Sequence, residues 1–334
     1  MNQISPSFEE LRRQVDDAVL GFLAARRDEL AESQLLFEEI ERVVRAGGKR
    51  IRPSFCYWGY RAAGLPHDAT AVSGAAALEL LHTFALIHDD VMDGTSERRG
   101  RPTVHVAHDV PTAILAGDLA LVLADELLMA ACTDAGAVTR TFEVYARMRR
   151  EVIAGQYLDI SSAREAIDES RARRIAVLKS GRYSVMEPLL VGAALANAAP
   201  QIRGSLARYG EPLGEAFQLK DDLLGIFGDP AATGKPVDSD IREGKRNLLF
   251  AKTTAALTGT ELDFFTSRWG GNDLLDEEVV RLRGLVDASG ARRAVETLVH
   301  ELRLVAEDAL DDDLDPTARA ALQELVSVVV ARDR

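Results

Sequence analysis

The sequence predicts an all-α protein, a single-domain bundle of long, mostly antiparallel helices. Three observations support this fold class. Apolar residues recur at three- and four-residue spacings along most of the 334-residue chain. The alternation of apolar and polar residues that is typical of a half-buried strand is almost absent. No Pro- or Ser-rich linker divides the chain, so we expect one domain over 1–334.

The predicted helices follow one another with short connections. Ser7 can cap a first helix over 8–30, and Gly47-Gly48 ends a second helix over 34–46. Longer segments with helical periodicity follow, over 52–63, 69–93, 110–132, 137–163, 168–181, 184–198 and 201–227. Charged loops interrupt them at 94–103 and 228–246, and shorter amphipathic helices fill 247–332.

Composition excludes several classes of function. The chain is 47% hydrophobic and 28% charged, with a formal net charge of -13, which makes nucleic acid an unsuitable partner. No membrane span is expected, and the N-terminus lacks the basic start and apolar run of a signal peptide, so the cytoplasm is the expected location. Cys56 and Cys132 lie far apart and are expected to be buried, reduced thiols.

A cluster of carboxylates closes one predicted helix. Asp89, Asp90 and Asp93 precede Gly94, and positions 89 and 93 share a helix face. The helix macrodipole disfavours carboxylates at a C-terminus, by about 0.3–1 kcal/mol each. A divalent cation reverses this effect, and magnesium prefers such oxygen ligands while leaving positions open for phosphate. An ordinary solvated helix end is the competing interpretation.

A second acidic pair favours the metal-binding interpretation. Asp221 and Asp222 end another apolar helix, and FQLKDDLLG over 217–225 resembles FALIHDDVMD over 84–93. This internal similarity can place two acidic clusters opposite each other across a cavity.

Basic residues accompany both acidic clusters and indicate a polyphosphate substrate. They lie beside turns, and together they resemble an anion site in two parts. The residues are Arg45, Lys49, Arg50 and Arg52; Arg98, Arg99 and Arg101; Lys179 and Arg182; and Lys235, Lys245 and Arg246. Lys179 and Arg182 flank a helix break expected at Gly181. His82 lies seven residues before Asp89 on almost the same helix face, which suits a diphosphate hydrogen bond. A buried core histidine is the alternative.

Taken together, these motifs resemble the trans-isoprenyl diphosphate synthase (polyprenyl synthetase) family over nearly the whole chain. The segments that carry the resemblance are GGKRIRP (47–53), LLHTFALIHDDVMDGTSERRGRPTVH (80–105), GQYLDI (155–160), LKSGR (178–182), FQLKDDLLGIFGD (217–229) and GKPVDSDIREGKR (234–246). The resemblance implies the isoprenoid synthase fold with a central cavity, a homodimer, and the joining of isopentenyl diphosphate to an allylic diphosphate.

The resemblance also assigns roles to individual residues. The resemblance implies that five aspartates bind magnesium, with three ions per active site, and the allylic diphosphate. These are Asp89, Asp90, Asp93, Asp221 and Asp222. The same diphosphate is assigned to Arg98, Lys179 and Lys235, and that of isopentenyl diphosphate to Lys49, Arg52, His82 and Arg99. The reacting centre is assigned to Gln218 and Lys245.

The second aspartate motif departs from the family pattern, because Gly225 stands where a third aspartate is usual. Glycine cannot bind metal and costs about 1 kcal/mol inside a helix. Some family members share this change, so activity is still expected, and Gly225→Asp is expected to change it only modestly.

Product length depends on residues that precede the first aspartate motif. An aromatic residue five positions before the motif limits elongation in the family, which implies that Phe84, with Ala85 and Leu81, sets a geranylgeranyl product. Ideal helix geometry places Ala85 and Leu81 nearer the aspartate face than Phe84. A farnesyl or longer-chain synthase, a terpene cyclase and a non-catalytic partner subunit are the alternatives.

Overall fold

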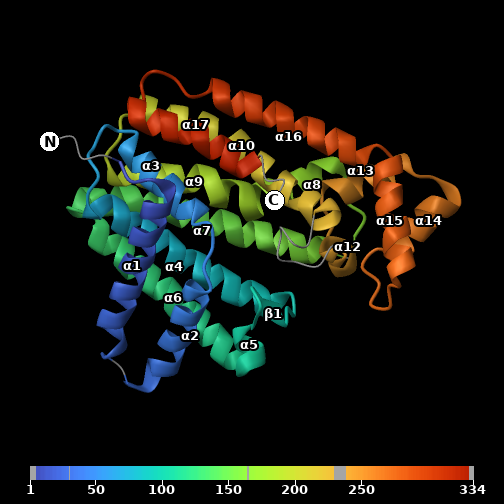
Figure 1. The fold of residues 1–334 in the computed structure, drawn as a ribbon, viewed down its shortest axis with the longest axis horizontal. Helices are drawn as coiled ribbons and strands as arrows, with labels where there is room; N and C mark the ends of the chain where they lie inside the picture. Colours follow the sequence, from blue (N-terminus) through green and yellow to red (C-terminus); the bar gives the residue numbers. More distant parts are fainter. Residues whose placement is uncertain (1–4, 30, 164, 229–237, 331–334) are drawn as a thin grey trace. The chain divides into compact units, whose positions relative to one another are not determined.

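The computed structural model describes residues 5–29, 31–163, 165–228 and 238–330, and it confirms the all-α class (Figure 1). The elements up to the middle of the chain are α1 (Phe8–Arg27), η1 (Ala31–Ser33), α2 (Gln34–Arg45), α3 (Ile51–Arg61), α4 (Ala69–Met92), β1 (Glu97–Arg98), β2 (Arg101–Pro102), α5 (Val104–Ala107), α6 (Val110–Ala131) and α7 (Ala135–Ser162). The later elements are α8 (Glu169–Ile175), η2 (Ala176–Met186), α9 (Glu187–Leu195), α10 (Pro200–Phe227), α12 (Ser239–Glu243), α13 (Leu248–Ala256), α14 (Gly259–Arg268), α15 (Asp276–Ala288), α16 (Ala291–Asp308) and α17 (Pro316–Val330).

The contacts within the chain define two compact units. Unit 1 consists of Met1–Tyr145, Pro188–Arg203 and Asp312–Arg319. Unit 2 consists of Ala146–Glu187, Gly204–Asp311 and Ala320–Arg334. The predicted first aspartate motif therefore belongs to unit 1 and the second to unit 2.

Unit 1 is built around α4, which packs against α6, α3 and α1 (Figure 1). Glycines allow unusually close helix contacts here. A Cβ on Gly59 of α3 would lie 2.1 Å from the Leu189 carbonyl oxygen of α9, and one on Gly192 would lie 1.9 Å from that of Cys56. The Cys56 side chain is fully buried at this contact, as predicted, whereas Cys132 at the end of α6 is only half-buried.

Unit 2 has its own apolar core, formed by helices that follow α10 in the chain. Leu223 and Ile226 of α10 contribute to it, together with Ile241 of the short helix α12 and Phe250 of α13. Ile241 has no exposed surface, so α12 is fixed to this core by its central residue.

Local sequence signals explain several helix ends. The Ser7 hydroxyl accepts from the Glu10 backbone amide at 3.3 Å while the Glu10 carboxylate accepts from the Ser7 amide at 2.8 Å, which forms a capping box. After α2, Gly47 and Gly48 have φ values of 84° and 150°, which a residue with a side chain rarely adopts.

Three local predictions were incomplete or wrong. The expected helix break at Gly181 does not exist: the π-helix η2 runs through it and joins α8 to α9. The loop 94–103 contains the two-residue strands β1 and β2, and the second loop contains α12.

Of the described helices, α4 alone is long and apolar enough to cross a membrane, and 61% of its most apolar window is buried inside the protein, as in a core helix.

Candidate active site

The first half-site lies in unit 1 and begins at the loop between α2 and α3. Arg50, grouped with the phosphate-binding cations by its position in the sequence, is only 4% exposed and turns into the protein. Its guanidinium donates to Asp16 at 2.6 Å, to Glu79 at 2.8 Å and to the Val44 carbonyl at 2.7 Å. Arg50 therefore fixes the loop that carries Lys49 and is itself not available to substrate.

The next residues of this loop meet α4. The Arg52 guanidinium lies 3.2 Å from Nε2 of His82. Because arginine only donates, Nε2 accepts and the histidine is neutral. Burial, assisted by the charges of Arg52 and Arg99, holds the pKa of His82 well below its usual range. Arg99 also donates to the Gly47 carbonyl, so the GGKRIRP loop contacts the segment 80–105 at two points, His82 and Arg99.

The first aspartate motif closes α4 as predicted, with Asp93 as the C-terminal cap. Asp89 is half-buried and Asp93 is exposed, whereas Asp90 is 5% exposed. Both Asp90 oxygens accept from Arg98, at 2.7–3.1 Å. The three carboxylates are thus not equivalent, because Asp90 holds Arg98 in place at the end of α4.

The second half-site lies in unit 2 and includes Lys179 on η2. Its ammonium donates to Asp159 of α7 at 2.5 Å. A Cβ on Gly155, one helical turn before Asp159, would lie 2.3 Å from the Lys179 backbone nitrogen. The GQYLDI segment therefore positions Lys179 in two ways, through close backbone contact and through a carboxylate. Asp159 belongs to a motif quoted above, but the sequence alone did not identify it as a positioning residue.

The second aspartate motif continues this half-site. Asp222 is 6% exposed, and its Oδ1 accepts from the Gln218 amide at 2.7 Å. Burial and the neighbouring Asp240 raise the pKa of Asp222 to about 8. Lys245 donates to Asp240 at 2.9 Å, and although burial opposes its charge, Asp240 and Glu243 raise the pKa of Lys245. Asp221 is half-buried beside Asp222 in the sequence.

Sequence reasoning did not select Asp240. The available signal was its position five residues before Lys245, in a segment already recognised as a motif. Lys235, predicted to bind the allylic diphosphate, lies outside the described residues.

The donor set of both half-sites fits magnesium. In the described part of the chain, no three His, Cys, Asp or Glu side chains form a ready metal cage. Magnesium does not require one, because it keeps several waters and binds through one or two carboxylates plus substrate phosphate oxygens. A cation beside Asp222 would favour the ionised carboxylate that burial and Asp240 oppose.

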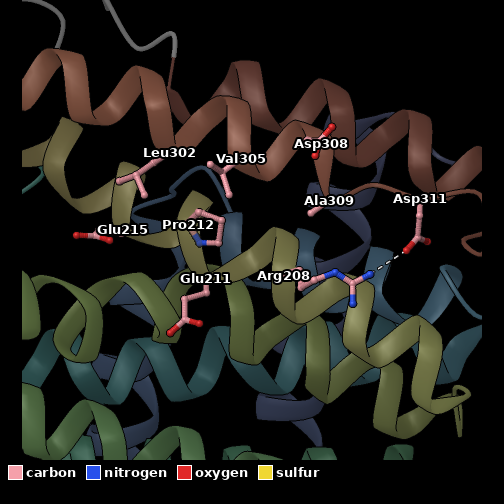
Figure 2. A pocket seen from close by; sticks show the side chains of 9 residues that line it. All are labelled: Arg208, Glu211, Pro212, Glu215, Leu302, Val305, Asp308, Ala309 and Asp311. Carbon is pink, nitrogen blue, oxygen red and sulfur yellow. Dashed lines mark hydrogen bonds and ion pairs between the residues drawn. The ribbon is translucent and has the colours of Figure 1, made fainter.

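A surface pocket of about 530 Å³ lies elsewhere in unit 2, between α10 and α16 (Figure 2). Figure 2 shows Pro212 and the ion pair between Arg208 and Asp311, 3.0 Å long, on its wall. No residue predicted to bind metal or diphosphate lines this pocket. By contrast, a small cavity of about 20 Å³ in unit 1 is lined by Asp90, Arg98 and Arg99 among others.

Comparisons with known proteins agree with this fold. The structure matches that of a geranylgeranyl pyrophosphate synthase from Corynebacterium glutamicum, complexed with isoprenyl diphosphate and magnesium, with a TM-score of 0.92 and 34% identity over 98% of this chain and 100% of that one. The chain is 35% identical over 295 residues to the (2E,6E)-farnesyl diphosphate synthase of Mycobacterium tuberculosis, covering 85% of this chain and 80% of that protein. It is 30% identical over 335 residues to the geranylgeranyl diphosphate synthase of Saccharolobus solfataricus, covering 99% and 98%.

Fold and site together define an all-α enzyme with the isoprenoid synthase fold. The family model for polyprenyl synthetase matches residues 33–280. The chain belongs to the polyprenyl synthetase family, and it is a trans-prenyltransferase.

Proposed function

We propose that this prenyltransferase condenses isopentenyl diphosphate with an allylic diphosphate and releases geranylgeranyl diphosphate and diphosphate. The allylic substrate is dimethylallyl, geranyl or farnesyl diphosphate. One observation carries the proposal: the meeting of two separate motifs in the first half-site, where Arg52 contacts His82 and Arg99 contacts Gly47. Such an assembly of cationic groups around a glycine loop suits a diphosphate.

In this proposal the chain's own residues have separate tasks. Lys49, Arg52 and Arg99 bind the diphosphate of isopentenyl diphosphate, and neutral His82 orients Arg52 for this contact. A neutral imidazole keeps its hydrogen-bond acceptor and adds no further positive charge.

The allylic diphosphate is assigned to the two aspartate motifs with Arg98 and Lys179. The ion pair with Asp90 orients Arg98, and the ion pair with Asp159 orients Lys179, so both cations are oriented before substrate binds. Gln218 and Lys245 lie beside Asp222 and Asp240 at the reacting centre. These residues stabilise the departing diphosphate, after which the double bond of isopentenyl diphosphate attacks the allylic cation and a proton is lost.

Magnesium is the proposed cofactor, with three ions per active site. The residues proposed to hold it are Asp89, Asp90 and Asp93 in unit 1 and Asp221 and Asp222 in unit 2. When bound, magnesium supplies Lewis-acid stabilisation of the negative charge on the leaving diphosphate.

The proposal also includes the domain organisation, the location and the oligomeric state of the enzyme. Both units serve one catalytic domain over 1–334, because each contains one aspartate motif. The enzyme is a cytoplasmic homodimer. Leu115, Val122 and Met129 of α6 lie seven residues apart on one helix face and are 52–55% exposed, which gives an apolar surface suited to a second copy.

Product length rests on Phe84. In the structure its ring packs against His88, with ring centroids 4.8 Å apart, and His88 contacts α6 at the Ile114 carbonyl. Phe84 therefore shares a helix face with His88 more closely than with Asp89. The assignment of Phe84, Ala85 and Leu81 to chain length stays a prediction from the family resemblance.

A product assay with pure enzyme tests these proposals. The enzyme is incubated with magnesium, labelled isopentenyl diphosphate and each allylic primer, and the products are sized after phosphatase treatment. We expect twenty-carbon products from the wild type and longer ones from Phe84→Ala. Fifteen-carbon products would favour a farnesyl synthase, a cyclic hydrocarbon formed without isopentenyl diphosphate would indicate a terpene cyclase, and no turnover would indicate a partner subunit. Unchanged products from Phe84→Ala would remove that residue as the determinant.

A further inference from the structure

The second aspartate motif ends at Gly225, and the structure shows what occupies the space of the missing side chain. A Cβ built on Gly225 would lie 2.4 Å from both Cγ and Oδ2 of Asp240 and 2.7 Å from its Oδ1. Non-bonded carbon and oxygen atoms do not approach so closely, so the carboxylate of Asp240 fills the position that a residue 225 side chain would take.

Asp240 is held in this place by the packing of α12. Ile241, the next residue, has no exposed surface and belongs to the core of unit 2. The Ile241 carbonyl accepts from the Gly270 amide at 3.0 Å, and the Lys245 carbonyl accepts from the Trp269 indole at 3.1 Å. Both ends of the segment that carries Asp240 are therefore tied to the same loop after α14.

The surroundings of this carboxylate are those of the second half-site. Asp240 is 5% exposed, and its carboxylate packs over Gly225, three residues after Asp222 on α10. Its Oδ1 accepts from Lys245, which is assigned to the reacting centre. Carboxylate oxygens from α10 and α12 suit magnesium, which binds through one or two carboxylates together with water and phosphate oxygens.

We propose that Asp240 supplies the carboxylate that the Asp-Asp-Leu-Leu-Gly motif lacks, so that it completes the magnesium-binding half-site of Asp221 and Asp222 from α12. Gly225 is then part of this arrangement, because only a residue without a side chain leaves room for the carboxylate. The earlier expectation that Gly225→Asp changes activity only modestly is replaced: that substitution forces Asp240 out of its place. The inference rests on the proposed function.

Metal binding to the intact enzyme tests the inference without turnover. Free Mn²⁺, used in place of Mg²⁺, is measured by electron paramagnetic resonance in the presence of inorganic diphosphate. We expect Asp240→Asn and Gly225→Ala each to weaken binding by about 10- to 100-fold, the range found when groups that support a metal site are removed. The double variant Gly225→Asp/Asp240→Gly moves the carboxylate to α10 and is expected to recover most of the lost affinity.

Glu243→Gln is the matched control. Glu243 is 49% exposed and pairs with the same Lys245 ammonium at 2.9 Å, whereas the three atoms nearest to a Cβ on Gly225 all belong to Asp240. If Asp240 served only as a partner for Lys245, the two variants would behave alike. Wild-type affinity in this control, with weakened binding in Asp240→Asn, supports the inference.

Two results would overturn the inference, and they are distinguishable. Full Mn²⁺ affinity in Asp240→Asn, whether or not its melting temperature falls, would show that the carboxylate is structural only and would leave the proposed function intact. Failure of the wild type itself to bind Mn²⁺ with diphosphate would contradict the magnesium proposal and this inference with it.

Discussion

The buried pair of Arg50 and Glu79 shows how much one side chain contributes to the substrate loop. Glu79 lies on α4 with 3% exposure, and burial raises its pKa to about 7 although Arg50 and Arg52 oppose this. Arg50 has a φ of 49°, which is uncommon for a residue with a side chain, and its ion pairs hold it there. The glycine loop is thus ordered by a cation that does not bind substrate.

Replacing Arg50 with methionine is expected to destabilise the fold by about 3–5 kcal/mol, because breaking a buried ion pair leaves its partner charge uncompensated. The loss depends on pH. The pKa of Glu79 is raised on folding, so its contribution to stability falls as pH rises from about 4.5 toward 7. Without Arg50 the pKa rises further, and the difference from wild type grows as pH increases through 7.

Urea unfolding of both proteins at pH 5.5 and 8 measures this difference. Adding Glu79→Gln to the variant provides the control, since a neutral amide removes the titrating group. An equal loss of stability at both pH values would contradict the assigned role of Glu79.

The aspartates at the end of α4 are expected to bind metal. Without metal, they are expected to lower the free energy of unfolding. Asp89→Asn should reduce turnover by about a hundredfold or more, comparable to the loss of an oriented group that stabilises developing charge. The free energy of unfolding should rise by about 0.3–1 kcal/mol, because a carboxylate is removed from a helix C-terminus. Rates at saturating magnesium, together with urea unfolding, separate the two effects.

Asp263→Asn, on an exposed face of α14, serves as the control and should leave both quantities unchanged. Near wild-type turnover in Asp89→Asn would remove this residue from the metal site.

At the scale of elements, the π-helix η2 depends on a glycine contact with α10. A Cβ on Gly214 would lie 2.3 Å from the Gly181 carbonyl oxygen, which is a backbone atom. π-Helical turns occur often at functional sites, and this one carries Lys179. Contact between the two helices therefore positions a proposed substrate ligand.

Gly214→Val is expected to destabilise the protein by about 1–3 kcal/mol through overpacking. Because η2 must shift, it should also raise the Michaelis constant for the allylic substrate more than that for isopentenyl diphosphate. Gly21→Ala is the control: nothing lies within 4 Å of its Cβ position, and replacing glycine inside α1 should add about 0.5–1 kcal/mol of stability. An unchanged Michaelis constant in Gly214→Val would show that η2 does not depend on this contact.

These elements also show how far the sequence could predict the structure. Helical periodicity and capping residues such as Ser7 were sufficient for the long helices, because both signals are local. The helix break expected at Gly181 was wrong, since that glycine serves close packing with Gly214, a partner distant in sequence. Asp240 was missed for the same reason: its importance comes from its position over Gly225, and spacing along the chain does not reveal it.

At the scale of the whole molecule, the apolar face of α6 is expected to determine the oligomeric state. Val122→Glu places a charge at the centre of the row formed with Leu115 and Met129. If this face joins two copies, burying that charge is costly and the mass measured by light scattering should fall from that of a dimer to that of a monomer. Val280→Glu on α15, where the valine is 57% exposed, should leave the mass unchanged. A dimer that persists in Val122→Glu would exclude this face as the interface.

The contact that buries Cys56 beneath Gly192 has a practical consequence for chemical labelling. The Cys56 thiol has no exposed surface, and burial raises its pKa, so it is both inaccessible and a poor nucleophile. Cys132, at the end of α6, is half-buried and donates to the Leu128 carbonyl at 3.4 Å. Since the chain has only these two cysteines, a maleimide dye should attach to the native enzyme at Cys132 alone. The enzyme thus carries a natural single attachment site for a fluorescent reporter beside the face proposed to join two copies.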